Sequence, residues 1–133
     1  MRYLLDSDIV IYHLNGVVQA INLLDQLAGD GMAMSAVTYM EVLQGPGSRT
    51  AEQQERLSVL LNLVPVLPMT EAEALRCADI RLALAAEGKR VRSRALDLIV
   101  AATALEHNLT MVTNNVSDYA DIPGLLVLQM PVM

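Results

Sequence analysis

Short strand-like runs alternate along this chain with longer runs of helical period, and this alternation limits its fold more than any other feature. Tyr3–Leu5 has the composition of a buried strand that ends in a loop, and residues 17–28 carry apolar side chains at helical spacing. A helical crossover returns the chain to pair in parallel, and helices then cover both faces of the sheet. The sequence therefore predicts an α/β fold of three layers, with a short, mainly parallel β-sheet flanked by helices on both faces.

Capping signals and chain breakers mark the remaining elements. Thr50 with Gln53 and Thr70 with Glu73 have the spacing of capping boxes. The Gly-Pro-Gly run at 45–47 ends the helix before it, and prolines 65 and 68 favour an edge strand or a bulge. We expect helices over residues 35–43, 50–62, 70–87 and 93–107, each begun by a Ser or Thr, and strands over residues 32–34, 63–67, 109–113 and 125–128. Between the last two strands we expect a loop with one helical turn.

Length and apolar content indicate a single packed unit. The 133 residues suffice for one domain of ordinary size, so we expect residues 1–133 to form one domain. Hydrophobic residues make up 53% of the chain, which excludes disorder over most of it. This share is high for a short chain, so six helix leucines either fill the core or cover a partner's surface: Leu23, Leu24, Leu27, Leu57, Leu60 and Leu61.

Cysteine content and hydropathy bound the environment of the protein. The single Cys77 excludes an intrachain disulfide and a Cys-rich zinc site. The longest apolar stretches, such as residues 98–105, are too short to span a bilayer. Asp6 and Asp8 interrupt what would be the apolar core of a signal peptide. We therefore expect a cytoplasmic protein that does not enter a membrane.

The charge balance restricts any contact with nucleic acid. Acids outnumber bases 15 to 9, which excludes broad, salt-driven nucleic-acid binding. The chain has no Phe and no Trp, which argues against a base-stacking module. Four of the nine bases are nevertheless concentrated at Lys89, Arg90, Arg92 and Arg94. This run is either a solvated loop or a surface on which Arg92 and Arg94 bind RNA phosphates or a partner's carboxyl groups.

Acidic residues recur where strands of the predicted sheet end. Parallel α/β sheets bind ligands at the carboxyl ends of their strands, which is where these acids are expected: Asp6, Asp8, Glu41, Asp97 and Asp118. Asp97 lies among apolar neighbours, where a carboxylate is costly unless it is paired or binds a cation. Oxygen ligands without His or Cys favour Mg²⁺ or Mn²⁺. Each acid taken singly could instead be a helix cap or a solvated residue.

Four segments carry a resemblance to a known family. Residues 4–11, LLDSDIVI, resemble the opening of PIN-domain nucleases, and residues 34–42 are similar to the helix that presents their glutamate. Residues 97–105 resemble their third acidic motif, and residues 113–119, TNNVSDY, their closing T-x-N-x-x-D-F. The resemblance runs from residue 3 to about residue 128, in the order and spacing of VapC-type toxins of bacterial toxin–antitoxin pairs.

The resemblance implies a PIN-like metal-dependent endoribonuclease. Asp6, Asp97 and Asp118 would hold Mg²⁺ or Mn²⁺, and Glu41 would orient or deprotonate the attacking water. Substrate and ligands would be positioned by Ser7, Asp8, Asn115, Arg92 and Arg94. The products would carry 5′-phosphate and 3′-hydroxyl ends. The expected partners are an RNA substrate, a cognate antitoxin protein and a second copy of the chain.

Three positions depart from the family's common pattern. Asp8 stands where many members have Asn, which adds a negative charge. Ser7 replaces Thr and keeps its hydroxyl, and Tyr119 replaces Phe and keeps an aromatic anchor. None of the three changes removes a member of the acidic quartet.

Two other functions compete with this interpretation. Asp6-Ser7-Asp8 also fits the start of haloacid-dehalogenase-type phosphatases, in which Asp6 would be a nucleophile, but Asp97 has no role there. A non-catalytic acidic Mg²⁺-binding module is the second, although a receiver-like domain needs an Asp where this chain has residues 67–69, Leu-Pro-Met.

Overall fold

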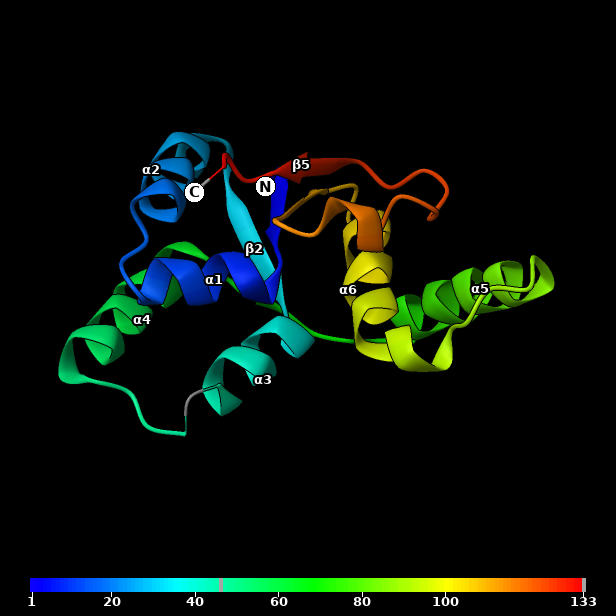
Figure 1. Cartoon of the computed structure of the whole chain (residues 1–133), viewed down its shortest axis with the longest axis horizontal. Helices are drawn as coiled ribbons and strands as arrows, with labels where there is room; N and C mark the ends of the chain where they lie inside the picture. The colour runs from blue at the N-terminus through cyan, green and yellow to red at the C-terminus, as the bar shows by residue number, and fades with distance from the viewer. Residues whose placement is uncertain (46, 133) are drawn as a thin grey trace.

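Five parallel strands form the centre of the computed structural model, which describes residues 1–45 and 47–132. The strands are β1 (Tyr3–Leu5), β2 (Met32–Ser35), β3 (Val66–Leu67), β4 (Thr110–Thr113) and β5 (Val127–Gln129). Their order across the sheet is β3-β2-β1-β4-β5, and each neighbouring pair is parallel. The predicted α/β class and its parallel sheet are confirmed (Figure 1).

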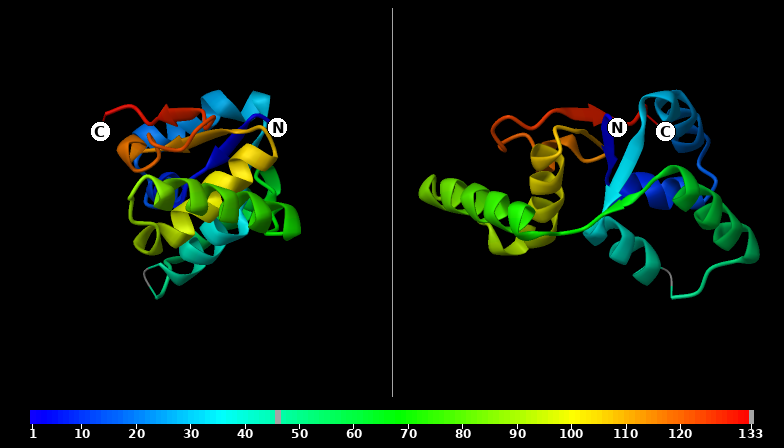
Figure 2. Two further views of the ribbon diagram at one scale, coloured as in Figure 1. Left: turned by 90° about the vertical axis from the view of Figure 1, so that its right-hand side faces the viewer. Right: turned by 180° about the vertical axis from the view of Figure 1, so that it is seen from behind.

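Helices cover the sheet on both sides, so the predicted three layers are confirmed. The helices are α1 (Ser7–Leu14), α2 (Val18–Leu27), α3 (Ala36–Gln44), α4 (Ala51–Leu63), α5 (Glu71–Ala86) and α6 (Ala95–Glu106). Helices α1, α2 and α4 lie on one side, and α5 and α6 lie on the other (Figures 1 and 2). Helix α3 lies below the end of the sheet in Figure 1, between the two groups.

The side-chain alternation of the strands divides the core into two clusters. Leu5 of β1 packs with α1, α2 and α4, whereas its neighbour Leu4 packs with α5 and α6. Of the six helix leucines, five are buried in the first cluster and Leu61 packs against it. The five buried leucines fill the core, so the alternative of a partner surface is wrong for them, whereas Leu61 is only partly buried.

Most expected helix boundaries agree with the structure. Ser35 caps α3, and both capping boxes form at the starts of α4 and α5. Helix α3 ends at Gln44, and Pro46 of the predicted Gly-Pro-Gly stop lies outside the described residues. Asn108 has a φ of 56°, as expected for a left-handed helix stop.

Three expectations about secondary structure are wrong. The residues after Leu5 form α1 instead of a loop, because Asp6 caps a helix whose Ile9, Val10 and Leu14 are buried. Helix α4 continues to Leu63 and shortens the strand predicted at 63–67 to β3, which keeps its predicted edge position. Helix α6 begins at Ala95, after a 3₁₀ turn at Arg92–Arg94, and not at Ser93.

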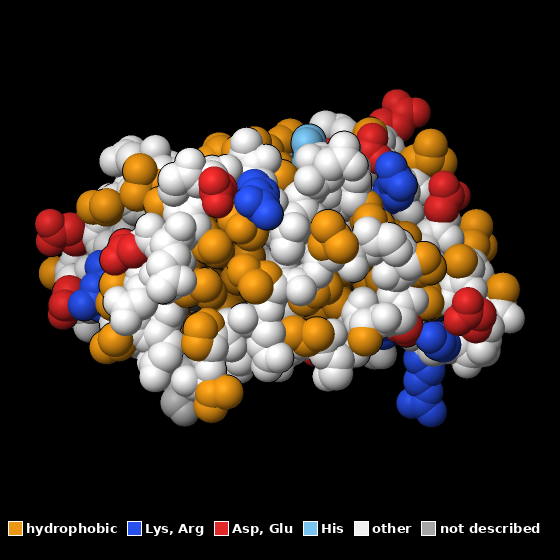
Figure 3. Space-filling view, turned by 90° about the horizontal axis from the view of Figure 1, so that it is seen from above, with side chains coloured by type: hydrophobic (Ala, Val, Ile, Leu, Met, Phe, Trp, Pro, Cys, Tyr) orange, Lys and Arg blue, Asp and Glu red, His pale blue; other side chains and the backbone are white. Residues whose placement is uncertain are grey.

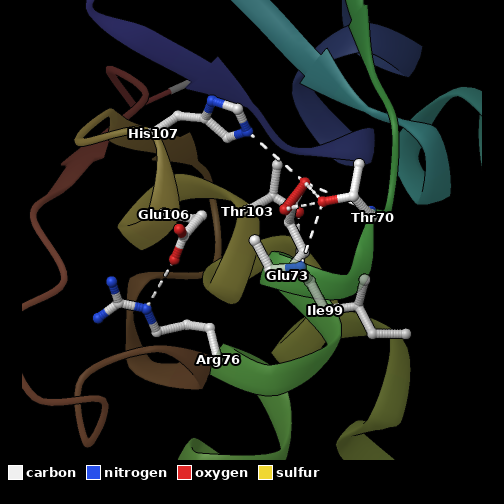
Figure 4. Close-up of polar contacts among 8 residues, drawn as sticks. Thr70, Glu73, Arg76, Ile99, Thr103, Glu106 and His107 are labelled. Atoms are coloured by element: carbon white, nitrogen blue, oxygen red, sulfur yellow. Dashed lines mark hydrogen bonds and ion pairs between the residues drawn. The ribbon is translucent and has the colours of Figure 1, made fainter.

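Polar contacts fix α5 against α6. The buried Glu73 carboxylate accepts a hydrogen bond from the Thr70 hydroxyl over 2.8 Å, and His107 Nε2 lies 3.7 Å from it (Figure 4). Although burial raises the pKa of Glu73, the hydrogen bonds from Thr70 and the nearby His107 lower it below its ordinary value. Arg76 of α5 also pairs with Glu106 of α6 over 3.1 Å. Helix α6, which carries Asp97, is therefore held firmly.

Exposed apolar side chains remain away from the core. Leu75 and Leu82, two turns apart on α5, are 65% and 70% exposed. Hydrophobic side chains are spread over the face in Figure 3, and most of its charged side chains lie towards the two ends. Within residues 1–45 and 47–132, every helix is too short or too polar to cross a membrane.

Candidate metal-dependent active site

The candidate site lies at the point in the sheet where the strand order changes direction. Strands β2 and β3 follow β1 on one side, whereas β4 and β5 lie on the other, so β1 and β4 meet at the switch point. Ligands of such sheets bind in the crevice at the carboxyl ends of the strands there. Asp6 directly follows β1, and Thr113 ends β4.

Asp6 is held by donors from three parts of the chain. Its Oδ1 accepts a hydrogen bond from the Ser7 N–H over 2.9 Å, which caps α1. Its Oδ2 accepts bonds from the Thr113 and Tyr119 hydroxyls, each over 3.0 Å. The side chain is 6% exposed, and burial followed by the nearby Asp8 raises the pKa of its carboxyl. Asp6 therefore has a fixed orientation, with acceptor capacity left on Oδ1.

Asp8 anchors the loop that follows β4. Its Oδ2 accepts hydrogen bonds from the Asn114 N–H over 3.0 Å and from Asn115 Nδ2 over 3.2 Å. The Thr113 hydroxyl lies 3.3 Å from the same oxygen, and Oδ1 accepts the Ile9 N–H over 2.8 Å. Burial raises the pKa of Asp8 despite these bonds. The structure thus brings Asp8 and Asn115 together and directs the Asn115 amide at Asp8.

Asp97 and Glu41 face Asp6 from two other helices. Asp97 is in the first turn of α6, and Glu41 lies in the second half of α3. Burial, followed by repulsion from Asp6, raises the pKa of Asp97. Burial also raises the pKa of Glu41, and the charges of Asp6 and Asp97 raise it further, whereas the Ser7 side chain lowers it. The predicted carboxylates are therefore close enough to repel one another.

Asp118 lies at the edge of this group. It is exposed in the 3₁₀ turn Val116–Asp118, and its charge contributes to the raised pKa of Asp97. Its backbone carbonyl accepts a hydrogen bond from Arg94 over 2.9 Å. The structure therefore places Asp118 beside Asp97 and more open to solvent.

The two predicted phosphate-binding arginines have different surroundings. Arg92 helps to line a cleft of about 300 Å³ together with Glu41, Ser93, Ala95, Leu96 and Asp97. Arg94 instead pairs with Asp121 through two bonds of 2.9 and 2.8 Å, and Lys89 Nζ lies 3.3 Å from the same carboxylate. The Arg94 and Lys89 side chains lower the pKa of Asp121 to about 2. Arg92 thus lies beside the acidic site, whereas Arg94 braces the turn around Asp118 and Asp121.

The chemistry of the donor set fits a hard divalent cation. The site offers carboxylate oxygens whose raised pKa values reflect burial and mutual repulsion, and a cation would offset both. In the part of the chain that the structure describes, no three Asp, Glu, His or Cys side chains are already placed as a ligand set. The carboxylates therefore lie around the site, but three of them do not converge on one metal position in the described residues.

Sequence reasoning missed two groups of the site. The sequence predicts Tyr119 only as an aromatic anchor, yet its hydroxyl also donates a hydrogen bond to Asp6. Asp121 was not singled out, although it holds both Arg94 and Lys89. The replacement of the family's Phe by Tyr at 119 was the available signal for the first. A second acid three residues after Asp118 was the signal for the other.

A family model and known proteins match this chain. The model of the PIN domain family matches residues 3–124. Ribonuclease VapC10 of Mycobacterium tuberculosis is 37% identical over 114 residues, covering 85% of this chain and 82% of the relative. Ribonuclease VapC2 of Rickettsia felis is 28% identical over 131 residues, covering 96% of each chain. A toxin–antitoxin complex from Klebsiella pneumoniae contains a similar chain, with 27% identity, a TM-score of 0.71 and 95% coverage of both chains.

Proposed function

Since the chain belongs to the PIN domain family, we propose that it is a VapC-type ribonuclease, the toxin of a toxin–antitoxin pair, which cleaves RNA with a divalent metal ion. The relatives named ribonuclease VapC10 and VapC2 support the activity. One observation of the site carries the proposal: Asp6, Glu41 and Asp97 repel one another at the switch point of the sheet, and burial adds to their raised pKa values. Residues 1–133 would act as a single nuclease domain.

Asp6, Asp97 and Asp118 are the proposed ligands for Mg²⁺ or Mn²⁺. When bound, such an ion supplies a water of lowered pKa and offsets the negative charge that develops on the phosphate. The Ser7 N–H and two hydroxyls orient Asp6, which leaves Oδ1 with capacity for a ligand. Asp97 approaches from the opposite layer of the fold, and Asp118 adds a solvent-exposed carboxylate beside it.

Glu41 is the proposed base for the attacking water. A carboxylate with a raised pKa accepts a proton more readily at neutral pH than an ordinary one, and that of Glu41 is raised. Glu41 lines the same cleft as Asp97, which supports this role. Water would attack the phosphorus in line, the bond from phosphorus to the 3′-oxygen would break, and the products would carry 5′-phosphate and 3′-hydroxyl ends without any part for the 2′-hydroxyl.

Arg92 is the proposed contact for an RNA phosphate. Its place beside Glu41 and Asp97 in the cleft supports this role. Arg94 contributes to RNA binding by bracing the turn that carries Asp118, because Asp121 already occupies its guanidinium. Asp8 and Asn115 position the substrate through the loop that they join.

The proposed partners are a cognate antitoxin and a second copy of the chain. The Klebsiella pneumoniae neighbour is a toxin–antitoxin complex, which supports the first. The exposed Leu75 and Leu82 of α5 offer apolar side chains for the second, because exposed apolar side chains favour association. Since its substrate is RNA, we place the protein in the cytoplasm. The phosphatase alternative is weaker, because Asp97, whose carboxyl interacts with Asp6, would have no role in it.

Expression in a bacterial host tests the proposal. The wild-type chain is expected to arrest growth and deplete RNA, whereas Asp6→Asn and Asp97→Asn are expected to be harmless at equal protein levels. Asp79→Asn, which changes an exposed carboxylate of α5, is the matched control and is expected to remain toxic. Equal toxicity of wild type and both site variants would overturn the proposed function.

A further inference from the structure

Four basic residues lie in the short segment between α5 and α6, and the structure divides them into two kinds. Lys89 Nζ lies 3.3 Å from the Asp121 carboxylate, and Arg94 binds the same carboxylate over 2.9 and 2.8 Å. Arg90 and Arg92 are exposed and form no ion pair with another residue of the described ranges 1–45 and 47–132. A single acid from the loop after β4 therefore holds two of the four bases.

Asp121 occupies the part of Arg94 that would bind a phosphate. Nη1 of Arg94 donates to Oδ2 of Asp121 over 2.9 Å, and Nη2 donates to Oδ1 over 2.8 Å. Nη2 also donates to the backbone carbonyl of Asp118 over 2.9 Å. Arginine binds carboxylate and phosphate groups in the same way, through parallel N–H bonds from its planar guanidinium. While Asp121 is bound, both terminal nitrogens of Arg94 are therefore engaged, and a phosphate would have to displace the carboxylate.

The Arg94 guanidinium lies at the rim of the acidic site. Arg94 directly precedes α6, and Asp97 is in the first turn of that helix. The bond to the Asp118 carbonyl brings the guanidinium to the turn that lies beside Asp97. The Arg94 and Asp121 side chains are only 21% and 25% exposed, so solvent and salt screen their attraction less than that of a surface pair. Without Asp121, Arg94 would be a free cation within reach of RNA bound at the site.

A phosphate contact of this kind carries no information about RNA sequence. Contacts from Lys and Arg to the backbone raise the affinity for every RNA and make that affinity depend on salt. Discrimination between two RNAs is a difference of affinities, so a contact that both RNAs make adds nothing to it. With Arg94 as an additional phosphate ligand, the site would bind all RNAs more tightly without selecting better among them. An acid that neutralises Arg94 therefore limits non-selective binding.

We propose that Asp121 is a specificity-determining residue, which keeps the Arg94 guanidinium from binding the RNA backbone and thereby limits sequence-independent binding beside the acidic site. This inference rests on the proposed function, in which RNA binds there. Lys89 gains little freedom when Asp121 is removed, because Glu87 also lies 3.5 Å from its Nζ. Asp121 therefore acts on RNA binding mainly through Arg94.

The salt dependence of binding to oligouridylate, a single-stranded RNA, tests the proposal. In a Glu41→Gln background that blocks cleavage, and at constant Mg²⁺, Asp121→Asn is expected to tighten binding roughly threefold at low salt and to steepen the salt slope by about 1, as one further phosphate contact would. Glu87→Gln removes an equal charge from the same segment, leaves the Arg94–Asp121 pair intact and is expected to keep the slope of the parent. An unchanged slope in Asp121→Asn, or an equal change in Glu87→Gln, would overturn the proposal.

Arg94→Ala gives a second measurement, which does not depend on how well Asp121→Asn folds. Alone, this variant is expected to leave the salt slope unchanged, because Asp121 already occupies the arginine. A slope that falls by about 1 would show that Arg94 contacts RNA in the presence of Asp121 and would overturn the proposal. Combined with Asp121→Asn, Arg94→Ala is expected to abolish the steepening. A double variant that keeps the steeper slope would also overturn the proposal, since the gain would then not come from Arg94.

The outcomes separate this inference from the proposed function. If the wild-type chain cleaves RNA in Mg²⁺ while Asp121→Asn keeps the slope of its parent, only the inference fails. If the wild-type chain neither binds nor cleaves RNA in Mg²⁺, the proposed function fails, and the inference fails with it.

Discussion

Asp8 and Asn114 join two parts of the site that lie far apart in the sequence. The Asp8 carboxylate at the start of α1 accepts the backbone N–H of Asn114 over 3.0 Å, and the Asn115 side chain donates to the same oxygen over 3.2 Å. The loop after β4, which leads to Asp118 and Tyr119, is therefore held at the carboxyl end of β1. An Asn at position 8 offers one acceptor oxygen where Asp offers two.

Asp8→Asn is expected to loosen this loop. An amide cannot accept all the donors that now meet at residue 8, so the Asn114 N–H should open to solvent more often. The Asn115 N–H, which donates to the Thr113 hydroxyl in the same loop, should open with it. Amide hydrogen exchange at these two residues should be roughly tenfold faster, which corresponds to about 1.4 kcal/mol of lost local stability. Exchange in α5 serves as the internal control. Unchanged exchange at Asn114 and Asn115 would show that Asp8 does not anchor the loop.

The site carboxylates are expected to give the metal-free protein an unusual dependence on pH. The pKa values of Asp6, Asp8 and Asp97 are raised above the ordinary 3.8, and that of Glu41 above 4.5. The folded state therefore holds more protons than the unfolded chain from about pH 4 up to the raised values, so the free energy of unfolding falls as pH rises through this window. In EDTA, the melting temperature should be higher at about pH 5 than at about pH 7. A melting temperature that rises over this interval would contradict the expectation.

Removing one of these charges should stabilise the metal-free fold. Asp97→Asn relieves repulsion with Asp6 and is expected to add about 1 kcal/mol to the free energy of unfolding near pH 7, or roughly 3 °C in melting temperature. Saturating Mg²⁺ should raise the melting temperature of wild type but not that of Asp97→Asn. Asp79→Asn, at an exposed position of α5, is expected to behave as wild type. If Asp97→Asn lowers the melting temperature in EDTA, repulsion between the Asp97 and Asp6 carboxylates does not destabilise the metal-free fold.

Arg92 and Arg94 are expected to separate into a binding and a bracing role. In a Glu41→Gln background that blocks cleavage, Arg92→Ala should weaken RNA binding, reduce its salt slope by about 1 and change stability by less than about 0.5 kcal/mol. Arg94→Ala should cost about 1 kcal/mol of stability, because Asp121 loses its bidentate partner. If Arg92→Ala leaves the RNA affinity and its salt slope unchanged, the Arg92 side chain makes no contact with an RNA phosphate.

A double-mutant cycle checks the bracing role. Asp121→Asn should cost about as much as Arg94→Ala, and the double variant little more than either, because both remove the same pair. The pKa of Asp121 is lowered to about 2 from an ordinary 3.8, so the pair stabilises the fold above about pH 4, and this stabilisation disappears as pH falls towards 2. Additive losses in the cycle would show that the two residues act separately.

Local signals predicted the fold because they agree with its packing. Both capping boxes, the Ser35 cap and the edge position of β3 follow from single residues whose preferred surroundings the structure provides. Helix α1 escaped prediction because Asp6 has two roles: its carboxylate faces the site while its Oδ1 caps the helix. When Asp6 is considered only as a site carboxylate, its role as the N-cap of α1 is overlooked.

The members of the site could be named from spacing, but their connections could not. Asp6, Glu41 and Asp97 were expected together because the ends of parallel strands share one edge of the sheet. The bonds from Tyr119 to Asp6 and from Arg94 to Asp121 join residues more than 20 positions apart, and they depend on rotamers and on the exact path of a loop. No periodicity or motif encodes such contacts.

Cleavage of bacterial RNA by the purified chain tests the central claim most directly. In Mg²⁺, the wild-type protein should release fragments with 5′-phosphate ends, which a 5′-monophosphate-dependent exonuclease degrades. EDTA should stop this reaction, and Asp97→Asn should reduce its rate by at least about 100-fold, since the variant lacks a proposed metal ligand. Cleavage that persists in EDTA would contradict the metal requirement, and 5′-hydroxyl ends would contradict attack by water with the 3′-oxygen as the leaving group.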